Sequence, residues 1–449
     1  MTDATPLRPT PLAIERHRLD NGLAVVLHRD PSLPLVAVNL WYHTGSKNER
    51  RGKTGFAHLF EHMLFQGSAH VGANEHFRYV QSVGGVANGS TWFDRTNYYE
   101  TLPSSSLELG LWLESDRMGF LLPGMTQEKL ETQRQVVMNE RRQRVDNQPY
   151  GRAGERLWEL LFPAEHPYSW PVIGAMEDIE AATLDDVNEF FATWYVPDNA
   201  VLTLAGDFEP ARAMDLIQRY FGDIPRGARP RPPVENLEAR ATGERFDVVT
   251  DRVQLERLYL AYEIPAYGTR EWYGADLLAQ VFAGGKASRL YRDLVYEREL
   301  AQSISCYALP TEAAGSFHLT ATARPGTSLA TLERAVDEHL AAAAAAPPEP
   351  AELERVRNRL LTGYFAELQT LDRRADLLSQ FTTYFDRPED LAGEIATYLE
   401  IERGEVQAVA ARLRPENRAR LWVEPARERA ADAIDASVET VSVPSVPAA

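Results

Sequence analysis

The same order of local patterns occurs twice in this chain of 449 residues, on either side of a proline-rich segment. The segment, PRGARPRPPVENLEARA at 225–241, holds four prolines and lacks the periodicity of a helix or a strand. On each side an apolar strand pattern comes first, at 35–43 and at 257–262. A helical pattern that ends near a diglycine follows, and then a second strand pattern, at 97–102 and at 303–309. A repeat of about 200 residues predicts two copies of one α+β domain.

The proline-rich linker sets the expected domain boundaries. We expect the first domain over 1–225, the linker over 226–241 and the second domain over 242–449. The tail from about residue 425 is rich in alanine, valine and proline, and we expect part of it to be disordered.

Four further patterns in the first half can be assigned to elements. Continuous apolar runs predict strands at 23–28 and at 201–206. Helical spacing predicts one helix at 54–66, which Gly67 ends, and another at 127–145.

Composition disfavours several functional classes. The 47 lysine and arginine residues are outnumbered by 65 aspartate and glutamate residues, so the net charge of −18 disfavours a nucleic-acid-binding protein. Cys306 is the single cysteine, which excludes a disulfide framework and a cysteine metal cluster within this chain. The first residues lack the apolar core of a signal peptide, and no run approaches the ~20 apolar residues that span a membrane. We therefore expect a cytoplasmic protein with no membrane partner.

The most specific motif is His58-Leu59-Phe60-Glu61-His62, within the first predicted helix. Residues four apart lie on one face of a helix, so both imidazoles can reach the same cation. Glu61 lies beside them and can act as a general base. Imidazole suits Zn²⁺, and a catalytic zinc site typically has three protein ligands and one open position. The order of the motif inverts His-Glu-x-x-His and is found in zinc peptidases.

Two questions stay open from these residues alone. A histidine pair at this spacing can simply form a polar helix face. The third ligand is also undetermined. Glu140 is a candidate carboxylate in the sequence VVMNERR on the helix expected at 127–145. An ion pair with Arg141, Arg144 or another nearby arginine also explains this glutamate and is, from the residues alone, the better interpretation.

An ordered series of segments resembles the pitrilysin or insulinase-like zinc metallopeptidases, in the short-chain branch that includes the mitochondrial processing peptidase. The resemblance covers most of the chain. It implies two homologous α+β domains, each a mainly antiparallel sheet covered by helices, with Zn²⁺ as the cofactor and a peptide as the substrate. The segments that carry it are HLFEHMLFQGS (58–68), GGVANGSTWFDRTNYYETLP (84–103), VVMNERRQ (136–143), HPYSWPVIG (166–174), FFATWYVPDNAVLTLAGDF (190–208) and FAGGKASRLYRDLVYERELAQS (282–303).

The resemblance also implies the residues of the site. A glutamate that follows the histidine motif in this family falls on Glu140, so the implied zinc ligands are His58, His62 and Glu140, with Glu61 as the general base. An exposed strand edge near the zinc is implied to pair with an extended peptide, although the Asn-Gly pair within it can equally form a turn. The implied substrate-binding residues are Ala87, Asn88, Gly89, Ser90 and Thr91.

One position near the implied ligands departs from the family pattern. Members often place a further glutamate seven residues before the last ligand, where this chain has Gln133. A glutamine can hydrogen-bond a ligand or a water but supplies no charge. Substitution of residues that contact the metal ligands can weaken metal affinity or activity. Glu131 is nearby but lies on a different helix face.

A second departure concerns the other half of the chain. Family members usually carry there an arginine and, seven residues later, a tyrosine, which bind the substrate backbone and the transition-state oxyanion. Alignment on LVYERELAQS places Val295 and Gln302 at these positions, while Tyr296 and Arg298 are out of register. This implies that the chain is the zinc-bearing subunit of a heterodimer, whose homologous partner lacks zinc and supplies the pair. A homodimer is the alternative.

The resemblance and the motif together predict a zinc endopeptidase that hydrolyses short or unfolded peptides in a closed chamber. The alternative is a non-catalytic assembly subunit that retains the peptidase fold and binds no stoichiometric zinc. A third interpretation is a zinc enzyme of another chemistry, which would leave peptides intact.

Overall fold

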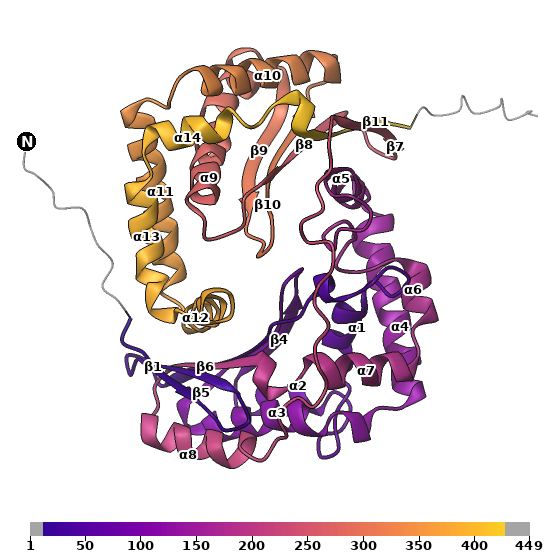
Figure 1. The fold of residues 1–449 in the computed structure, drawn as a ribbon, viewed down its shortest axis with the longest axis vertical. Helices are drawn as coiled ribbons and strands as arrows, with labels where there is room; N and C mark the ends of the chain where they lie inside the picture. The colour runs from indigo at the N-terminus through magenta and orange to yellow at the C-terminus, as the bar shows by residue number, and fades with distance from the viewer. Residues whose placement is uncertain (1–11, 427–449) are drawn as a thin grey trace, which may run out of the picture.

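The computed structural model describes residues 12–426, in which two lobes follow one another along the chain (Figure 1). Each lobe contains one β-sheet. Residues 222–244, between the lobes, form neither helix nor strand. The predicted domain boundaries stay a prediction, and the predicted disorder of the tail falls on residues 427–449, outside the described part of the chain.

The first sheet contains six strands in the order β1-β2-β6-β3-β5-β4. β2 and β6 are parallel, and the other neighbouring pairs are antiparallel. β4 lies at one edge, so one side of its backbone is free of pairing within the sheet. The strands are β1 (Glu15–Arg18), β2 (Ala24–Arg29), β3 (Leu35–Tyr42), β4 (Val86–Thr91), β5 (Thr96–Pro103) and β6 (Ala200–Gly206).

The second sheet contains five strands in the order β7-β11-β8-β10-β9. β7 and β11 are parallel, and the other neighbouring pairs are antiparallel. The edge opposite β7 is formed by β9. The strands are β7 (Arg245–Asp251), β8 (Arg257–Ile264), β9 (Ala301–Leu309), β10 (Gly315–Ala323) and β11 (Arg418–Pro425).

The two sheets share one topology. Strands β2 to β6 and strands β7 to β11 take the same order across their sheets, with the parallel pair at the same place. β1 is an additional edge strand of the first sheet. The predicted α+β fold with two mainly antiparallel sheets and covering helices is therefore confirmed.

Helices cover the sheets on both sides (Figure 1). Two further segments, η4 and η6, have the wider turn of a π-helix. The helical elements are α1 (Phe56–Met63), α2 (Glu75–Ser82), α3 (Leu107–Phe120), α4 (Gln127–Arg141), η4 (Arg142–Asp146), α5 (Ala153–Leu161), α6 (Met176–Ala181), α7 (Leu184–Trp194), α8 (Pro210–Phe221), α9 (Arg270–Ala283), η6 (Tyr291–Glu297), α10 (Leu329–Ala345), α11 (Pro350–Glu367), α12 (Leu371–Phe385), α13 (Leu391–Glu400) and α14 (Arg403–Ala410). Within residues 12–426, none of the helices combines the length and the apolar character needed to cross a membrane.

The outer face of the first sheet is covered by a helix from the second half. Side chains of β2 alternate between two faces, as the period of a strand requires. Val25 and Leu27 pack with the helices of their own half, whereas Ala24 and Val26 face the opposite side. There they contact a cluster that includes Leu378 of α12. In Figure 1, α12 accordingly lies beside the first sheet.

A helix of the first half covers the second sheet in return. Leu157 and Leu161 of α5 pack with Ala261 of β8 and with Leu421 and Val423 of β11. The two halves thus exchange one helix each, and each sheet completes its second apolar face with residues from the other half.

Two predicted helices are shorter than their sequence patterns suggest. The helix expected at 54–66 begins only at Phe56, because Gly55 has a left-handed φ of 82° that an α-helix does not accept, and it ends at Met63, four residues before Gly67. The helix expected at 127–145 is α-helical only to Arg141 and continues as the π-helical η4.

Leu378→Ala tests the exchanged packing, because this leucine is fully buried against the first sheet. The substitution should lower the free energy of unfolding by about 2–5 kcal/mol, since it removes buried contacts and leaves a cavity. Amide hydrogen exchange should become faster in β3 and β6 of the first half. Leu33→Ala, at a leucine that is 58% exposed, should change the stability by less than about 0.5 kcal/mol. Faster exchange confined to the second half would contradict the exchanged packing.

Candidate metal centre

A glutamate outside the helix fixes the start of α1. Gly55 has no side chain that could cap the helix, and its N–H and that of Ala57 donate to the carboxylate of Glu49 at 3.0 and 2.7 Å. Its two oxygens thus accept from two of the N–H groups that the first turn of a helix leaves without partners. The apolar face of α1 is buried and docks the helix on the core, through Phe56, Leu59, Phe60 and Met63.

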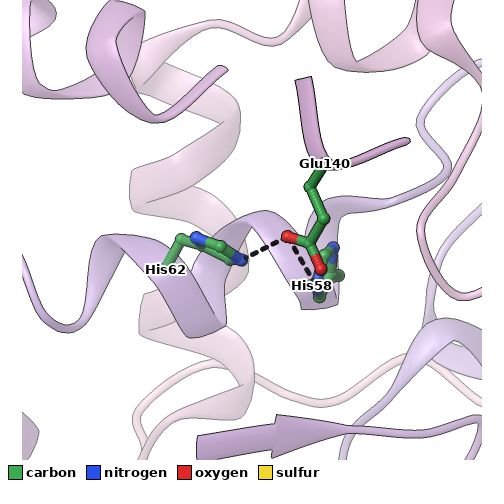
Figure 2. Close-up of side chains that lie close together, drawn as sticks. All are labelled: His58, His62 and Glu140. Carbon is green, nitrogen blue, oxygen red and sulfur yellow. Dashed lines mark ion pairs between the residues drawn. The ribbon is translucent and has the colours of Figure 1, made fainter. Parts of the chain in front are cut away.

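Glu140, near the end of α4, points its carboxylate at both histidines of α1 (Figure 2). Its Oε2 lies 3.2 Å from Nε2 of His62 and 3.8 Å from Nε2 of His58. One donor atom from each residue lies within 4.8 Å of the other two. The side chains of His58, His62 and Glu140 are 12, 23 and 15% exposed, so the cluster is largely enclosed but open to solvent.

Both interpretations of Glu140 find a contact in the structure. Its Oε1 pairs with Arg144 at 2.6 Å, while Oε2 faces the histidines. Arg141 pairs with Glu155 of α5 instead, at 2.6 and 2.9 Å. The ion pair on the exposed side therefore does not prevent the carboxylate from facing a cation held by the histidines.

The environment sets the charge of these groups. Burial, together with nearby His62, lowers the pKa of His58 to about 4. His58 is therefore neutral at pH 7, which is the form that binds a metal. The hydrogen bond with His62 holds the pKa of Glu140 below its usual value, although burial opposes the shift, so this carboxyl is ionised. Two imidazoles and one carboxylate are the donor set of a catalytic zinc site, and the cluster fits that ion.

Glu61 is held by the neighbouring strand β4. The hydroxyl of Thr91 donates to Oε2 of Glu61 at 2.5 Å. Burial raises the pKa of Glu61, although this hydrogen bond opposes the shift. A carboxylate with a raised pKa accepts a proton more readily near neutral pH. The contact joins segments that are distant in sequence, so the motif itself carries no signal for it.

The five residues predicted to bind substrate lie in β4, beside α1. A Cβ placed on Gly89 would lie 3.2 Å from Cγ of Glu61, so the strand passes directly beside this carboxylate. The backbone N–H of Gly89 donates to Oδ1 of the neighbouring Asn88 at 2.9 Å. Asn88 and Gly89 belong to the strand and not to a turn. Ala87 and Ser90 are half-buried in the same strand, and the binding role of all five residues stays a prediction.

Gln133 is buried on α4, two turns before Glu140. Within residues 12–426, no hydrogen bond joins it to His58 or His62, so its predicted support of the ligands stays a prediction. Glu131 pairs with Arg134 on the exposed face of the helix.

The positions aligned with the family's arginine and tyrosine lie in the second lobe. Val295 is buried in η6, and Gln302 is exposed on the edge strand β9. Tyr296 is 78% exposed, and Arg298 pairs with Glu338 at 2.9 Å. In the described part of the second lobe, no group of three metal-binding side chains comes together.

Two family models match successive parts of the chain. The model of insulinase, peptidase family M16, matches residues 24–164, and that of the peptidase M16 inactive domain matches residues 181–360. The zinc protease PqqE of Helicobacter pylori is 30% identical over 391 residues, which cover 85% of this chain and 82% of that protein. The chain belongs to peptidase family M16. The predicted family is thus confirmed, and the first M16 match contains the whole cluster of His58, Glu61, His62 and Glu140.

Solved structures show the same M16 architecture. The crystal structure of a protease from Helicobacter pylori has a TM-score of 0.85 at 26% identity and covers 93% of this chain and 100% of that one. A structure described as the peptidase M16 inactive domain from Pseudomonas fluorescens has a TM-score of 0.82 at 19% identity, over 92% of this chain and 98% of that one. The second likeness concerns the fold alone.

His62→Ala tests the metal centre through zinc content. The variant should lose about one equivalent of zinc per chain relative to the unchanged protein, because two remaining donors do not complete a zinc site. Elemental analysis after dialysis gives this number directly. His70→Ala, at a histidine that is 55% exposed and pairs with Asp116, should retain the zinc. Equal zinc in His62→Ala and the unchanged protein would contradict this site.

Proposed function

We propose that this M16 protein is a zinc endopeptidase that cleaves short or unfolded peptides, as the catalytic subunit of a heterodimer that encloses a chamber. The observation that carries the proposal is the convergence of His58, His62 and Glu140 next to Glu61 and the free edge of β4. We also propose a cytoplasmic location, which rests on the sequence alone.

The residues of the chain have distinct roles in this reaction. His58, His62 and Glu140 would hold Zn²⁺, which supplies a Lewis acid that activates water and polarises a carbonyl. Glu61 takes the proton of the attacking water and delivers it to the leaving amine. The hydroxyl of Thr91 holds Oε2 of Glu61, which leaves Oε1 for this proton transfer.

Strand β4 suits an extended substrate. A peptide that adds to its free edge is bound through backbone hydrogen bonds, which accept many sequences. Because Gly89 lies beside Glu61, such a peptide brings one of its carbonyl groups close to the general base. Only a segment without its own secondary structure can pair in this way, which supports short or unfolded peptides as the substrate class.

Glu61→Gln should retain zinc and lower kcat by about 10²–10⁴-fold, because glutamine keeps the shape of the side chain but cannot take a proton. Cleavage of a quenched fluorescent peptide library, with zinc measured in the same sample, tests both parts. Glu131→Gln, which changes an exposed glutamate on α4, is the matched control and should cleave at the normal rate. An unchanged rate in Glu61→Gln would exclude Glu61 as the base.

The heterodimer is tested by reconstitution with a homologous subunit that lacks the zinc motif and carries the arginine-tyrosine pair. The chain alone has Val295 and Gln302 at those positions. Without its partner it should cleave at less than about a hundredth of the rate of the reconstituted heterodimer, as expected when oxyanion donors are missing. The control is a partner whose arginine and tyrosine are both replaced by alanine. Full activity of the purified chain by itself would contradict the heterodimer.

A further inference from the structure

A second group of metal-binding side chains lies in the core of the first lobe, apart from the cluster of Figure 2. His76 comes from α2, Glu100 from β5 and Glu114 from α3. One donor atom of each lies within 4.8 Å of the other two, the same limit that holds for His58, His62 and Glu140. The group differs in exposure, because its three side chains are 5, 0 and 1% exposed and thus closed to solvent.

The donor atoms of this group are buried without partners. Nε2 of His76, both carboxylate oxygens of Glu100 and Oε2 of Glu114 form no hydrogen bond with any residue of the described chain. Nε2 of His76 lies 3.7 Å from the nearer oxygen of Glu100. Burial of an unpaired polar group is costly, and buried polar groups in folded proteins normally have a partner. Unpaired atoms on three side chains whose donor atoms lie this close together therefore indicate a bound species that contacts all three side chains.

Arg117 offsets part of the charge but leaves the free atoms unpaired. Its guanidinium pairs with Oε1 of Glu114 and lies over the ring of Tyr98, 4.2 Å from the ring centre. Two carboxylates and one guanidinium leave one net negative charge in an enclosed site. A divalent cation changes this to one positive charge of the same magnitude.

A proton is the competing way to neutralise the group. Burial raises the pKa of Glu100 to about 7, so a proton competes with a cation for this carboxyl near neutral pH. One proton, however, joins at most two of the four free atoms in a single hydrogen bond and leaves the other two without a partner. One cation can contact His76, Glu100 and Glu114 at once, and imidazole with carboxylates is a donor set that transition metals accept.

We propose that His76, Glu100 and Glu114 form a second, structural site for a divalent transition-metal ion of the Zn²⁺ or Mn²⁺ type. A closed site made of protein ligands stabilises the fold and has no open position for substrate. The ion ties together α2, β5 and α3. Glu100 lies opposite Ala87 in the pairing of β5 with β4, so the ion also holds the first residues of the edge strand β4 in place. The effect of this ion on peptide binding at β4 rests on the proposed function, whereas the metal site itself does not.

Metal counts in four forms of the full chain test this site. Each form is purified from cells supplied with zinc and manganese, and both metals are measured by elemental analysis. The unchanged chain should bind about two ions, and His58→Ala/His62→Ala and Glu100→Gln about one each. The combined variant should bind none. A different result is expected if the proposed peptidase site binds no zinc. The unchanged chain would then bind about one ion, which His58→Ala/His62→Ala would keep and Glu100→Gln would lose.

Thermal unfolding gives a second measurement on the same proteins. Zinc or manganese added to metal-free His58→Ala/His62→Ala should raise its Tm by at least about 2 °C, because a ligand of the folded state stabilises it. The increase should disappear when Glu100→Gln is added and persist with Glu108→Gln, which changes a more exposed glutamate of the same helix as Glu114. If Glu100→Gln does not fold, the metal content and the Tm shift of the folded His58→Ala/His62→Ala protein test the proposal by themselves. Absence of metal and of any Tm shift in that protein overturns the proposal and leaves a proton or water in the group.

Discussion

The fold depends on the exchange of one helix between the two halves of the chain. Each sheet has an apolar face that its own half leaves open, and α12 and α5 cover these faces reciprocally. Burial of such faces is the main source of stability, so the halves are expected to fold as one cooperative unit despite the proline-rich linker. The exchange also reaches the metal centre. Glu140 lies where α4 leads through η4 into the exchanged helix, and Arg141 beside it pairs with Glu155 of α5.

The two metal-binding groups of the first lobe differ in the property that decides what a metal could do there. The cluster of Glu140 and the two histidines is partly open and has a free strand edge beside it. The group around Glu100 is closed on all sides. Similar donor atoms can therefore support chemistry in one place and stability in the other. Exposure separates these roles, because a reacting carbonyl must reach the ion.

Local spacing predicted only part of this site. His58, Glu61 and His62 share one helix turn, and a single motif reveals them. Glu140 could be assigned only through the family resemblance, since its neighbouring arginines explain it as well. The hydrogen bond from Thr91 to Glu61 and the group of His76, Glu100 and Glu114 have no local signal at all, because they join separate elements. The repeated topology was predictable from the order of patterns, but the exchange of helices was not: an apolar stripe does not say which sheet it covers.

The second half has the same strand order as the first, but its counterpart of α1 is buried in the core. α9 follows β8 as α1 follows β3, yet its sequence, REWYGADLLAQVFA, contains no histidine. Ala275, Leu278 and Phe282 of α9 are buried, so the helix gains packing where α1 keeps a polar face. β9 still lies at the sheet edge that corresponds to β4. The second half thus retains the strand edge but lacks the histidine pair that α1 carries. Val295, at the position aligned with the family's arginine, is buried, so the second half does not present a charged group there.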